Sequence, residues 1–330
     1  MMFKKVFISR IIPEIGLTLL EEAGFEIDQW KDESKIITKE ELIKRCQDAD
    51  ALYSIGTVSL DEEFFSKCSH LKIVALMSVG YNHVDVDAAT KYGIPVTNTP
   101  GVLSRATADT AFLLMLAASR KAFYHHKKIL EGKWKSGISF DNLGIELYDK
   151  TLGVFGLGRI GVEMAKLCKG AYNMKVIYHN RNRNQEAEKL LGAEYVSFDE
   201  LLEWSDVVSA HTELTPETEG KFNRDAFSKM KKNALFINTA RGGVHNEKDL
   251  IEAIQNGIIW GAGLDVTNPE PMKTDNPLLN MPNVAVLPHI GSATIETRNE
   301  MAKLAAENII ALFNNEPLLT CINKELFETS

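Results

Sequence analysis

A glycine-rich stretch, Leu152–Gly170, constrains the fold of this chain more than any other feature of the sequence. A short apolar run, Leu152–Phe155, predicts a buried strand. Gly156, Gly158 and Gly161 follow it at G-x-G-x-x-G spacing. Apolar residues then recur at helical spacing, and the last glycine of the stretch is expected to end that helix. A strand, a glycine turn and a helix in this order are typical of a dinucleotide-binding unit.

Each of the three glycines has its own expected role. Gly156 permits the tight turn off the strand, and Gly161 lets the helix pack close to the strand. Gly158 removes a side chain where a pyrophosphate must approach the backbone, at a helix N-terminus that presents free N–H groups. The alternative is a glycine-rich turn that binds no ligand.

Length and composition narrow the class of protein. A chain of 330 residues favours two domains. The net charge of −8 gives no support to nucleic-acid binding. Four scattered cysteines without a C-x-x-C motif argue against a metal cluster or a disulfide framework. No signal peptide and no apolar run of about 20 residues is visible, so we expect a soluble cytoplasmic protein with no membrane partner.

Residues 1–100 repeat a short cycle of strand and helix, which predicts an open parallel sheet covered by helices. Thr38 and Glu41 are spaced as a capping box. The chain then runs through a long helix, about 104–121, into the glycine stretch, and strands and helices continue to alternate. A final amphipathic helix at 293–313 is expected to cross back to the first domain, because its own sheet is already complete. We therefore predict an α/β protein of two Rossmann-like or flavodoxin-like domains with parallel sheets and a cleft between them.

The end of the second strand of the dinucleotide unit bears on cofactor choice. NAD sites place a carboxylate there to bind the ribose 2′-hydroxyl. Here no acid appears between Tyr178 and Glu186, and Asn180, Arg181 and Arg183 occupy the loop. Arginine can bind a 2′-phosphate through two parallel hydrogen bonds. The sequence thus favours NADPH, with NADH possible; the alternative is a solvated basic loop beside a permissive site.

Three later strand ends carry the reactive residue types Arg241, Glu270 and His289. The carboxyl ends of parallel strands share one sheet edge, so these side chains can converge. A hydride transferred to a carbonyl carbon leaves an alkoxide, which histidine can protonate near neutral pH. A neighbouring carboxylate orients the ring, and an arginine can hold a substrate carboxylate and polarise the adjacent carbonyl. Taken singly, Glu270 could be a turn residue, His289 a core histidine, and Arg241 a helix-cap or phosphate ligand. Together they form a set suited to the reduction of a 2-oxo acid.

With these motifs the chain resembles the D-isomer-specific 2-hydroxyacid dehydrogenases over nearly its whole length, and within them the glyoxylate/hydroxypyruvate reductase branch. The motifs that carry the resemblance are the Ser78–Gly80 loop, the glycine stretch, 211–218, 238–242, 263–271 and 288–294. The resemblance implies that Arg241, Glu270 and His289 are catalytic. It also implies a substrate-binding lid domain of residues 1–102 plus 291–330, and a dinucleotide-binding domain of residues 103–290.

The resemblance further implies which residues bind ligands. The substrate is expected at Ser78, Val79, Gly80, Arg241 and Ser292, with the backbone N–H groups of Val79 and Gly80 holding its carboxylate. A plain turn is an equal alternative for this loop from its own residues. The cofactor is expected at Gly156, Gly158, Arg159, Ile160, Gly161, Asn180, Arg181, Arg183, His211, Pro216, Thr239, Ala240, Asp265 and Gly291. No metal is expected.

Residues 133–150 form an irregular excursion with several aromatic residues, among them Trp134, Phe140 and Tyr148. Such a segment packs either on its own domain or on a partner subunit, and we favour a subunit interface. The family implies a homodimer. Its reductase branch can carry a second aromatic residue just after the Trp134 position, but Gly137 and Ile138 stand there, so substrate selectivity cannot be carried over.

The expected function is NAD(P)H-dependent reduction of glyoxylate, hydroxypyruvate or a similar short 2-oxo acid to the D-2-hydroxy acid, with His289 as proton donor. 3-Phosphoglycerate dehydrogenase is a weaker alternative, because the Tyr81–His83 segment lacks Lys and Arg and no regulatory domain follows. A dinucleotide-sensing co-repressor is the non-enzyme alternative. Among the other histidines only His83, near the substrate loop, rivals His289.

Overall fold

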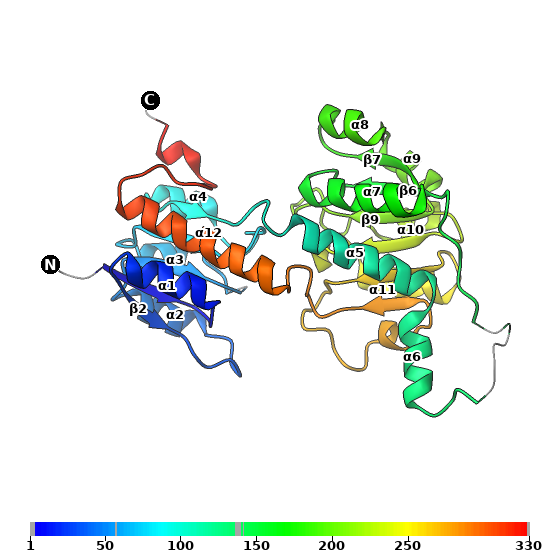
Figure 1. Cartoon of the computed structure of the whole chain (residues 1–330), viewed down its shortest axis with the longest axis horizontal. Coiled ribbons are helices and arrows are strands. Elements are labelled where there is room, and N and C mark those ends of the chain that lie inside the picture. The colour runs from blue at the N-terminus through cyan, green and yellow to red at the C-terminus, as the bar shows by residue number, and fades with distance from the viewer. Residues whose placement is uncertain (1–3, 57, 136–139, 141, 329–330) are drawn as a thin grey trace. The chain divides into compact units, whose positions relative to one another are not determined.

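The computed structural model describes residues 4–56, 58–135, 140 and 142–328. It divides into two units, each with its own parallel sheet (Figure 1). Unit 1 comprises Met1–Leu103 with Ala293–Ser330, and unit 2 comprises Ser104–Ser292. The two α/β units with parallel sheets confirm the predicted fold class.

Unit 1 contains a five-stranded sheet in the order β2-β1-β3-β4-β5, and every strand pair in it is parallel. Its strands are β1 (Lys4–Ile8), β2 (Phe25–Gln29), β3 (Ala51–Ser54), β4 (Ile73–Leu76) and β5 (Val96–Thr97). Its helices are α1 (Glu14–Glu22), α2 (Lys39–Cys46), α3 (Glu62–Lys67), α4 (Val86–Lys91) and α12 (Ile295–Phe313), with a 3₁₀ turn η3 (Lys324–Leu326).

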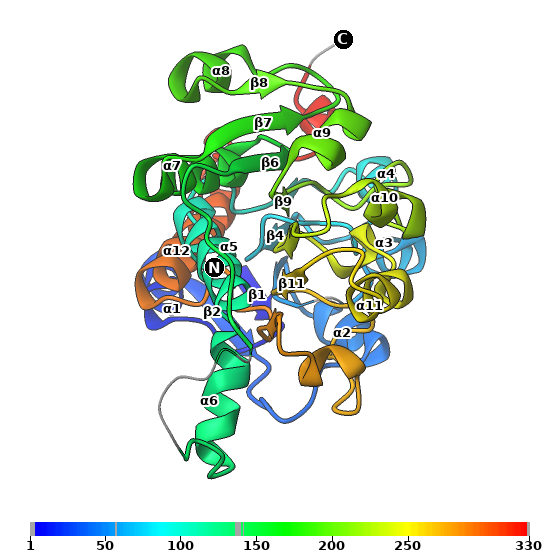
Figure 2. The ribbon, with the colours of Figure 1, turned by 90° about the vertical axis from the view of Figure 1, so that its right-hand side faces the viewer.

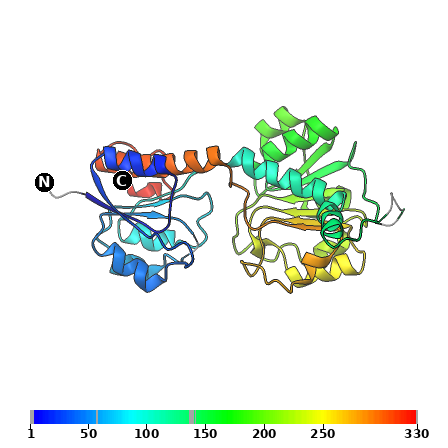
Figure 3. The ribbon, with the colours of Figure 1, turned by 60° about the horizontal axis from the view of Figure 1, so that its bottom comes forward.

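Helices cover both faces of this sheet. Helices α2 and α3 lie on one face (Figure 2). They pack there through a buried cluster that includes Leu42, Phe64 and Phe65. Helices α1 and α12 lie side by side on the other face (Figure 3). The Tyr53 hydroxyl donates to the carbonyl of Ala302 at 3.1 Å and ties α12 to β3. The final helix therefore belongs to the first unit, as predicted.

Unit 2 contains a seven-stranded sheet in the order β12-β11-β10-β9-β6-β7-β8, again parallel throughout. Its strands are β6 (Thr151–Phe155), β7 (Lys175–His179), β8 (Glu194–Tyr195), β9 (Val207–Ala210), β10 (Leu235–Asn238), β11 (Gly261–Leu264) and β12 (Val284–Val286). Its helices are α5 (Ser104–Ser119), α6 (Ala122–Leu130), α7 (Arg159–Tyr172), α8 (Gln185–Leu191), α9 (Phe198–Trp204), α10 (Arg224–Lys229) and α11 (Glu247–Gln255), with 3₁₀ turns η1 (Gly242–Val244) and η2 (Pro277–Asn280).

Unit 2 has a separate core on each face of its sheet. In β10, Leu235 and Ile237 enter the core shared with α5, α7 and α8, whereas Phe236 enters the core shared with α9, α10 and α11. Successive strand residues point to opposite faces, so a strand buried on both sides is apolar throughout. The site loops of unit 2 described below leave this sheet at the carboxyl ends of its strands.

Three local predictions were wrong. Helix α7 continues past Gly170 to Tyr172 and ends at Asn173, which adopts the left-handed conformation (φ 50°). Helix α5 ends at Ser119 rather than at residue 121. Thr38 does cap α2 by accepting from the N–H of Glu41, but the Glu41 carboxylate pairs with Arg45 and does not complete a capping box.

Among the described residues, no helix combines the length and apolar character needed to cross a bilayer. All four cysteines are free thiols, and Cys46, Cys68 and Cys168 are buried.

Candidate active site

The three glycines after β6 differ in what a side chain would meet. Gly156 has φ +98°, and a Cβ there would lie 2.7 Å from the carbonyl oxygen of His211. A Cβ on Gly161 would lie 2.6 Å from the carbonyl oxygen of Gly156 and 2.9 Å from Val154. A Cβ on Gly158 would meet nothing within 4 Å. The protein itself thus requires the first and third glycines, whereas the second only keeps space open.

That open space lies at the N-terminus of α7, whose N-cap is Gly158. Arg159 and Ile160 form the first turn, and the ring of N–H groups there has no side-chain cap. The combination of unfilled space and uncapped N–H groups suits a phosphate group. A dinucleotide therefore fits the residues present.

The loop after β7 is tied to the glycine loop by two amide side chains. The Asn180 Oδ1 accepts from the N–H of Leu157 at 2.6 Å, and the Asn184 Nδ2 donates to the Leu157 carbonyl at 2.9 Å. Asn184 also caps α8. Sequence analysis proposed Asn180 as a cofactor ligand and passed over Asn184; here both support the glycine loop.

The two arginines of this loop are not equivalent. Arg183 makes two hydrogen bonds with the Glu188 carboxylate, at 3.0 and 2.9 Å, and lies over the ring of Tyr195. Glu188 therefore already occupies the face of Arg183 that would bind a phosphate. Among the described residues, exposed Arg181 makes no hydrogen bond or ion pair. The role proposed for a basic group at a 2′-phosphate thus rests on Arg181.

The ends of β9 and β10 place His211 beside Thr239. The His211 Nε2 is 2.8 Å from the Ser209 hydroxyl, and its Nδ1 is 3.4 Å from the Thr239 hydroxyl. Burial lowers the pKa of His211 to about 4. His211 is consequently neutral at physiological pH and serves as a hydrogen-bonding wall. Pro216 lies exposed in the loop that follows.

His289 and Glu270 are in direct contact in unit 2. Glu270 lies in the loop after β11 and His289 in the loop after β12, and the His289 Nδ1 is 2.5 Å from the Glu270 Oε1. The two side chains are 45% and 39% exposed, so the pair is open to a substrate. Because Nδ1 is engaged, Nε2 is the nitrogen left to exchange a proton with a ligand.

Charge and burial act together on this group. Burial alone would raise the pKa of Glu270, but the hydrogen bond and charge of His289, the N–H of Thr267 and the charge of Arg241 outweigh it, so the pKa is lowered. Burial lowers the pKa of the Arg241 guanidinium, against the opposing effect of the Glu270 and Glu213 carboxylates. Arg241, just after β10, also donates from Nη1 to the Ala240 carbonyl at 2.7 Å.

His289 sits in a strained backbone that Asp265 stabilises. Its φ is +55°, in the left-handed region that non-glycine residues seldom adopt. The two oxygens of the buried Asp265 carboxylate accept from the N–H groups of Ile290 and Gly291, at 2.8 and 2.7 Å. Burial raises the pKa of Asp265, and these two N–H groups oppose that rise. Asp265 and Gly291, expected to touch the cofactor, thus hold the loop of His289; half-buried Ser292 follows them.

In unit 1, the Ser78–Gly80 loop follows β4 and has its carbonyl groups satisfied. The Ser78 hydroxyl donates to the Gly80 carbonyl, Asn98 Nδ2 donates to the Val79 carbonyl, and the Thr99 N–H donates to the Ser78 carbonyl, at 2.8–2.9 Å. Among the described residues, no acceptor is paired with the N–H groups of Val79 and Gly80. Two such groups side by side can hold an anion.

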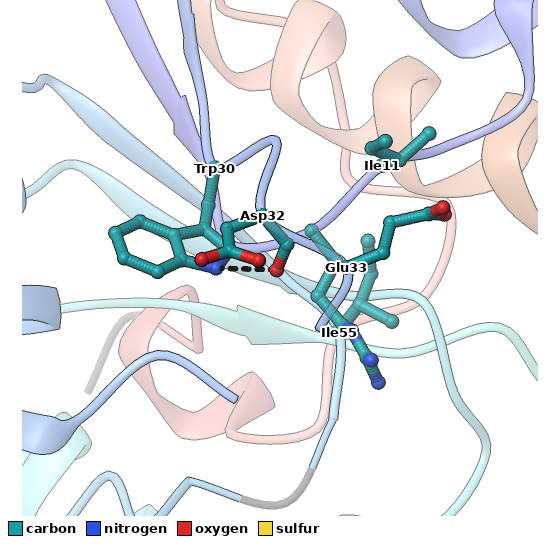
Figure 4. A pocket seen from close by; sticks show the side chains of 6 residues that line it. Ile11, Trp30, Asp32, Glu33 and Ile55 are labelled. Carbon is teal, nitrogen blue, oxygen red and sulfur yellow. Dashed lines mark hydrogen bonds between the residues drawn. The ribbon is translucent and has the colours of Figure 1, made fainter. Parts of the chain in front are cut away.

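A pocket of about 190 Å³ opens at the same edge of this sheet (Figure 4). Its walls come from the segments after β1, β2 and β3: Arg10, Ile11, Trp30, Asp32, Glu33 and Ile55. The indole N–H of Trp30 donates to the carbonyls of Asp32 and Lys35, so the ring is fixed as a wall. Strands β1 and β3 are neighbours at which the strand order reverses, the place where sheets of this type bind ligands. Sequence analysis missed this pocket.

Comparisons with known proteins agree with this arrangement. The family model described as "D-isomer specific 2-hydroxyacid dehydrogenase, NAD binding domain" matches residues 112–291. A glyoxylate reductase of Korarchaeum cryptofilum is 45% identical over 323 residues, which is 98% of this chain and 96% of the relative.

Two solved structures are similar over nearly their full length. One is a glyoxylate reductase from Paecilomyes thermophila, with a TM-score of 0.87, 34% identity and coverage of 98% of this chain and 100% of that chain. The other is an NADPH-dependent glyoxylate/hydroxypyruvate reductase from Sinorhizobium meliloti in complex with NADP and malonate. Its TM-score is 0.85, at 32% identity and 99% coverage of both chains.

Proposed function

We propose that this chain, which belongs to the D-isomer specific 2-hydroxyacid dehydrogenase family, reduces a short 2-oxo acid such as glyoxylate or hydroxypyruvate to the D-2-hydroxy acid. The observation that carries the proposal is the His289–Glu270 contact, with the charge of Arg241 acting on the same carboxylate. The reductase names of relatives at 32–45% identity support it.

In this proposal the residues of unit 2 handle the proton and the substrate. NAD(P)H supplies the hydride when it is bound at the glycine loop. His289 holds a proton on Nε2 and gives it to the carbonyl oxygen as that oxygen becomes an alkoxide. Glu270 holds the ring through Nδ1 and stabilises the charged imidazolium before the proton is transferred. Arg241 binds the substrate carboxylate with parallel N–H groups and polarises the neighbouring carbonyl.

We assign the dinucleotide site to unit 2 and further substrate contacts, beside those of Arg241, to unit 1. In unit 1 the N–H groups of Val79 and Gly80, for which the described part of the chain supplies no acceptor, bind the substrate carboxylate. The pocket around Arg10 and Trp30 lies along the same sheet edge, two strand spacings (about 10 Å) from that loop.

NADPH is the proposed preferred cofactor. Support comes from the absence of an acid between Tyr178 and Glu186, from Arg181, which makes no hydrogen bond or ion pair among the described residues, and from a relative solved with NADP. Because Glu188 pairs with Arg183, Arg181 is the arginine proposed to bind the 2′-phosphate, and NADH is a possible second cofactor.

The test is steady-state reduction of glyoxylate, hydroxypyruvate and 3-phosphohydroxypyruvate with NADPH and NADH in parallel, reported as kcat/KM. We expect the first two substrates with NADPH to be best. A preference for the phosphorylated substrate would favour the 3-phosphoglycerate dehydrogenase alternative. Tight NADPH binding without turnover of any 2-oxo acid would favour a dinucleotide sensor.

We also propose that the chain forms a cytoplasmic homodimer through the region around α6. Helix α6 buries none of its own residues: its Ile129 and Leu130 are 51% and 75% exposed, and Trp134 just beyond it is 74% exposed. Apolar surface of this kind is typical of an interface. Gly137 and Ile138, in the same excursion, lie outside the described residues. Sedimentation equilibrium would test this: a dimer is expected, and a monomer at micromolar concentration contradicts it.

A further inference from the structure

We infer that Asn238 and the buried His245 form a positioning pair that sets the backbone turn carrying Arg241. The catalytic part of this inference rests on the proposed function, whereas its structural part does not. Sequence analysis gave neither residue a role. Asn238 ends β10, and His245 follows the short 3₁₀ turn η1, so the two bracket the Thr239–Val244 segment.

The side-chain amide of Asn238 makes three contacts with this segment. Its Oδ1 accepts from the N–H of Ala240 at 2.9 Å. Its Nδ2 donates to the carbonyl of Arg241 at 2.9 Å and lies 3.0 Å from the Nδ1 of His245. A single fully buried amide therefore satisfies the polar backbone on both sides of the Ala240–Arg241 peptide.

These contacts fix the tautomer of His245. Because Oδ1 must accept from Ala240, the group that faces His245 is the NH₂, and Nδ1 must be the acceptor. The proton of the neutral ring is therefore on Nε2. Burial lowers the pKa of His245 to about 4, which keeps the ring neutral and Nδ1 able to accept.

Burying the imidazole of His245 is unfavourable for folding, and the hydrogen bond that its Nδ1 accepts gives a reason for a histidine at this position. His245 is 2% exposed and packs against Phe236, and its Nε2 finds no hydrogen-bond partner among the described residues. A buried donor without a partner destabilises the fold, and an apolar side chain of similar size avoids that loss. The imidazole is suited to this site because Nδ1 holds the Asn238 amide in one orientation.

The turn also abuts the loop that bears Glu270. A Cβ on Gly242 would lie 2.0 Å from the carbonyl oxygen of Thr267. The N–H of Thr267 in turn points to the Glu270 Oε2 at 3.4 Å. Without the hydrogen bonds of Asn238 the turn would shift, which would move Arg241 and displace the Thr267 segment that supports Glu270. We therefore expect Asn238 and His245 to affect substrate affinity.

The test compares His245→Met, which keeps the volume but removes the acceptor, with His245→Gln, which restores an acceptor oxygen. His245→Met is expected to raise the KM for glyoxylate at least tenfold, because misplacing a binding group by a fraction of an ångström has effects of this order. His245→Gln is expected to stay within about threefold of wild type by the same reasoning. Equal KM values in wild type and His245→Met, or equal losses in both variants, would overturn the inference.

Amide hydrogen exchange gives a readout that needs no activity. Exchange at the N–H of Ala240 should speed up in His245→Met and in Asn238→Leu, which removes the oxygen that accepts from this N–H, and stay slow in His245→Gln. Unchanged exchange in His245→Met would refute the structural part even if the enzyme reduces no 2-oxo acid. Wild-type inactivity toward every 2-oxo acid, with the exchange pattern as expected, would instead refute the proposed function alone.

Discussion

Replacing Gly158 by alanine should separate the binding of a dinucleotide from the stability of the fold. The structure gives this glycine no contact that forbids a Cβ, and its φ of −92° is open to alanine. Alanine at a compatible position stabilises a fold by about 0.4–1 kcal/mol through the unfolded chain. The melting temperature of Gly158→Ala should therefore equal or slightly exceed that of wild type.

Cofactor binding should respond in the opposite direction. The added methyl group occupies the space at the N-terminus of α7 and prevents a phosphate oxygen from reaching the backbone N–H. A hydrogen bond to a charged group contributes about 1.5–3 kcal/mol. Its loss corresponds to a roughly 10- to 150-fold higher dissociation constant for NADPH.

Gly161→Ala is the matched control within the same motif. Its Cβ would lie 2.6 Å from a backbone oxygen that cannot move aside easily. Overpacking of this kind costs about 1–3 kcal/mol, and the melting temperature should fall by roughly 3–10 °C. Differential scanning fluorimetry and fluorescence titration with NADPH measure both quantities. Wild-type NADPH affinity in a well-folded Gly158→Ala protein would refute the assignment of this loop to the pyrophosphate.

Three further predictions concern the reaction itself. His289→Ala should lower kcat for glyoxylate by about 10²–10⁴ with NADPH affinity kept; normal turnover would remove His289 from the mechanism. Glu270→Gln tests the charge of the partner: the lowered pKa of Glu270 keeps its carboxylate ionised until the pH falls below its ordinary 4.5, so the pair persists at neutral pH. Because the half-exposed pair contributes about 1 kcal/mol, Glu270→Gln should lower kcat for glyoxylate about fivefold at neutral pH, and an unchanged kcat would contradict this. Arg181→Ala should raise the KM for NADPH about tenfold, the loss of one charge-assisted contact, and leave that for NADH unchanged; equal effects would exclude a role at the 2′-phosphate.

Much of this architecture could be predicted from the sequence because it depends on local pattern. The alternation of apolar runs with helical periods predicts parallel sheets, and parallel strands bring Arg241, Glu270 and His289 to one sheet edge. The roles of Gly156 and Gly161 follow from backbone sterics alone. The contact between His289 and Glu270 required only that the loops after β11 and β12 be neighbours.

The features that could not be predicted depend on contacts between residues that no sequence motif links. Arg183 has Glu188 as its partner because the start of α8 brings that carboxylate back toward the loop. Asp265 binds backbone N–H groups of the His289 loop, which no side-chain motif reveals. The end of α7 was misplaced because Asn173 adopts the left-handed turn expected of glycine, so Gly170 was not needed to stop the helix.

The position of α12 has a consequence for the order in which this chain folds. Its buried face, which includes Met301, Ala305 and Ile309, covers one side of a sheet whose strands were all made before unit 2 began. Of the described helices, only α1 is available during translation to cover that side of the sheet until α12 is synthesised, after the whole of unit 2. Unit 2, encoded without interruption, can finish first. Nascent unit 1 is therefore the part that we expect chaperones to recognise.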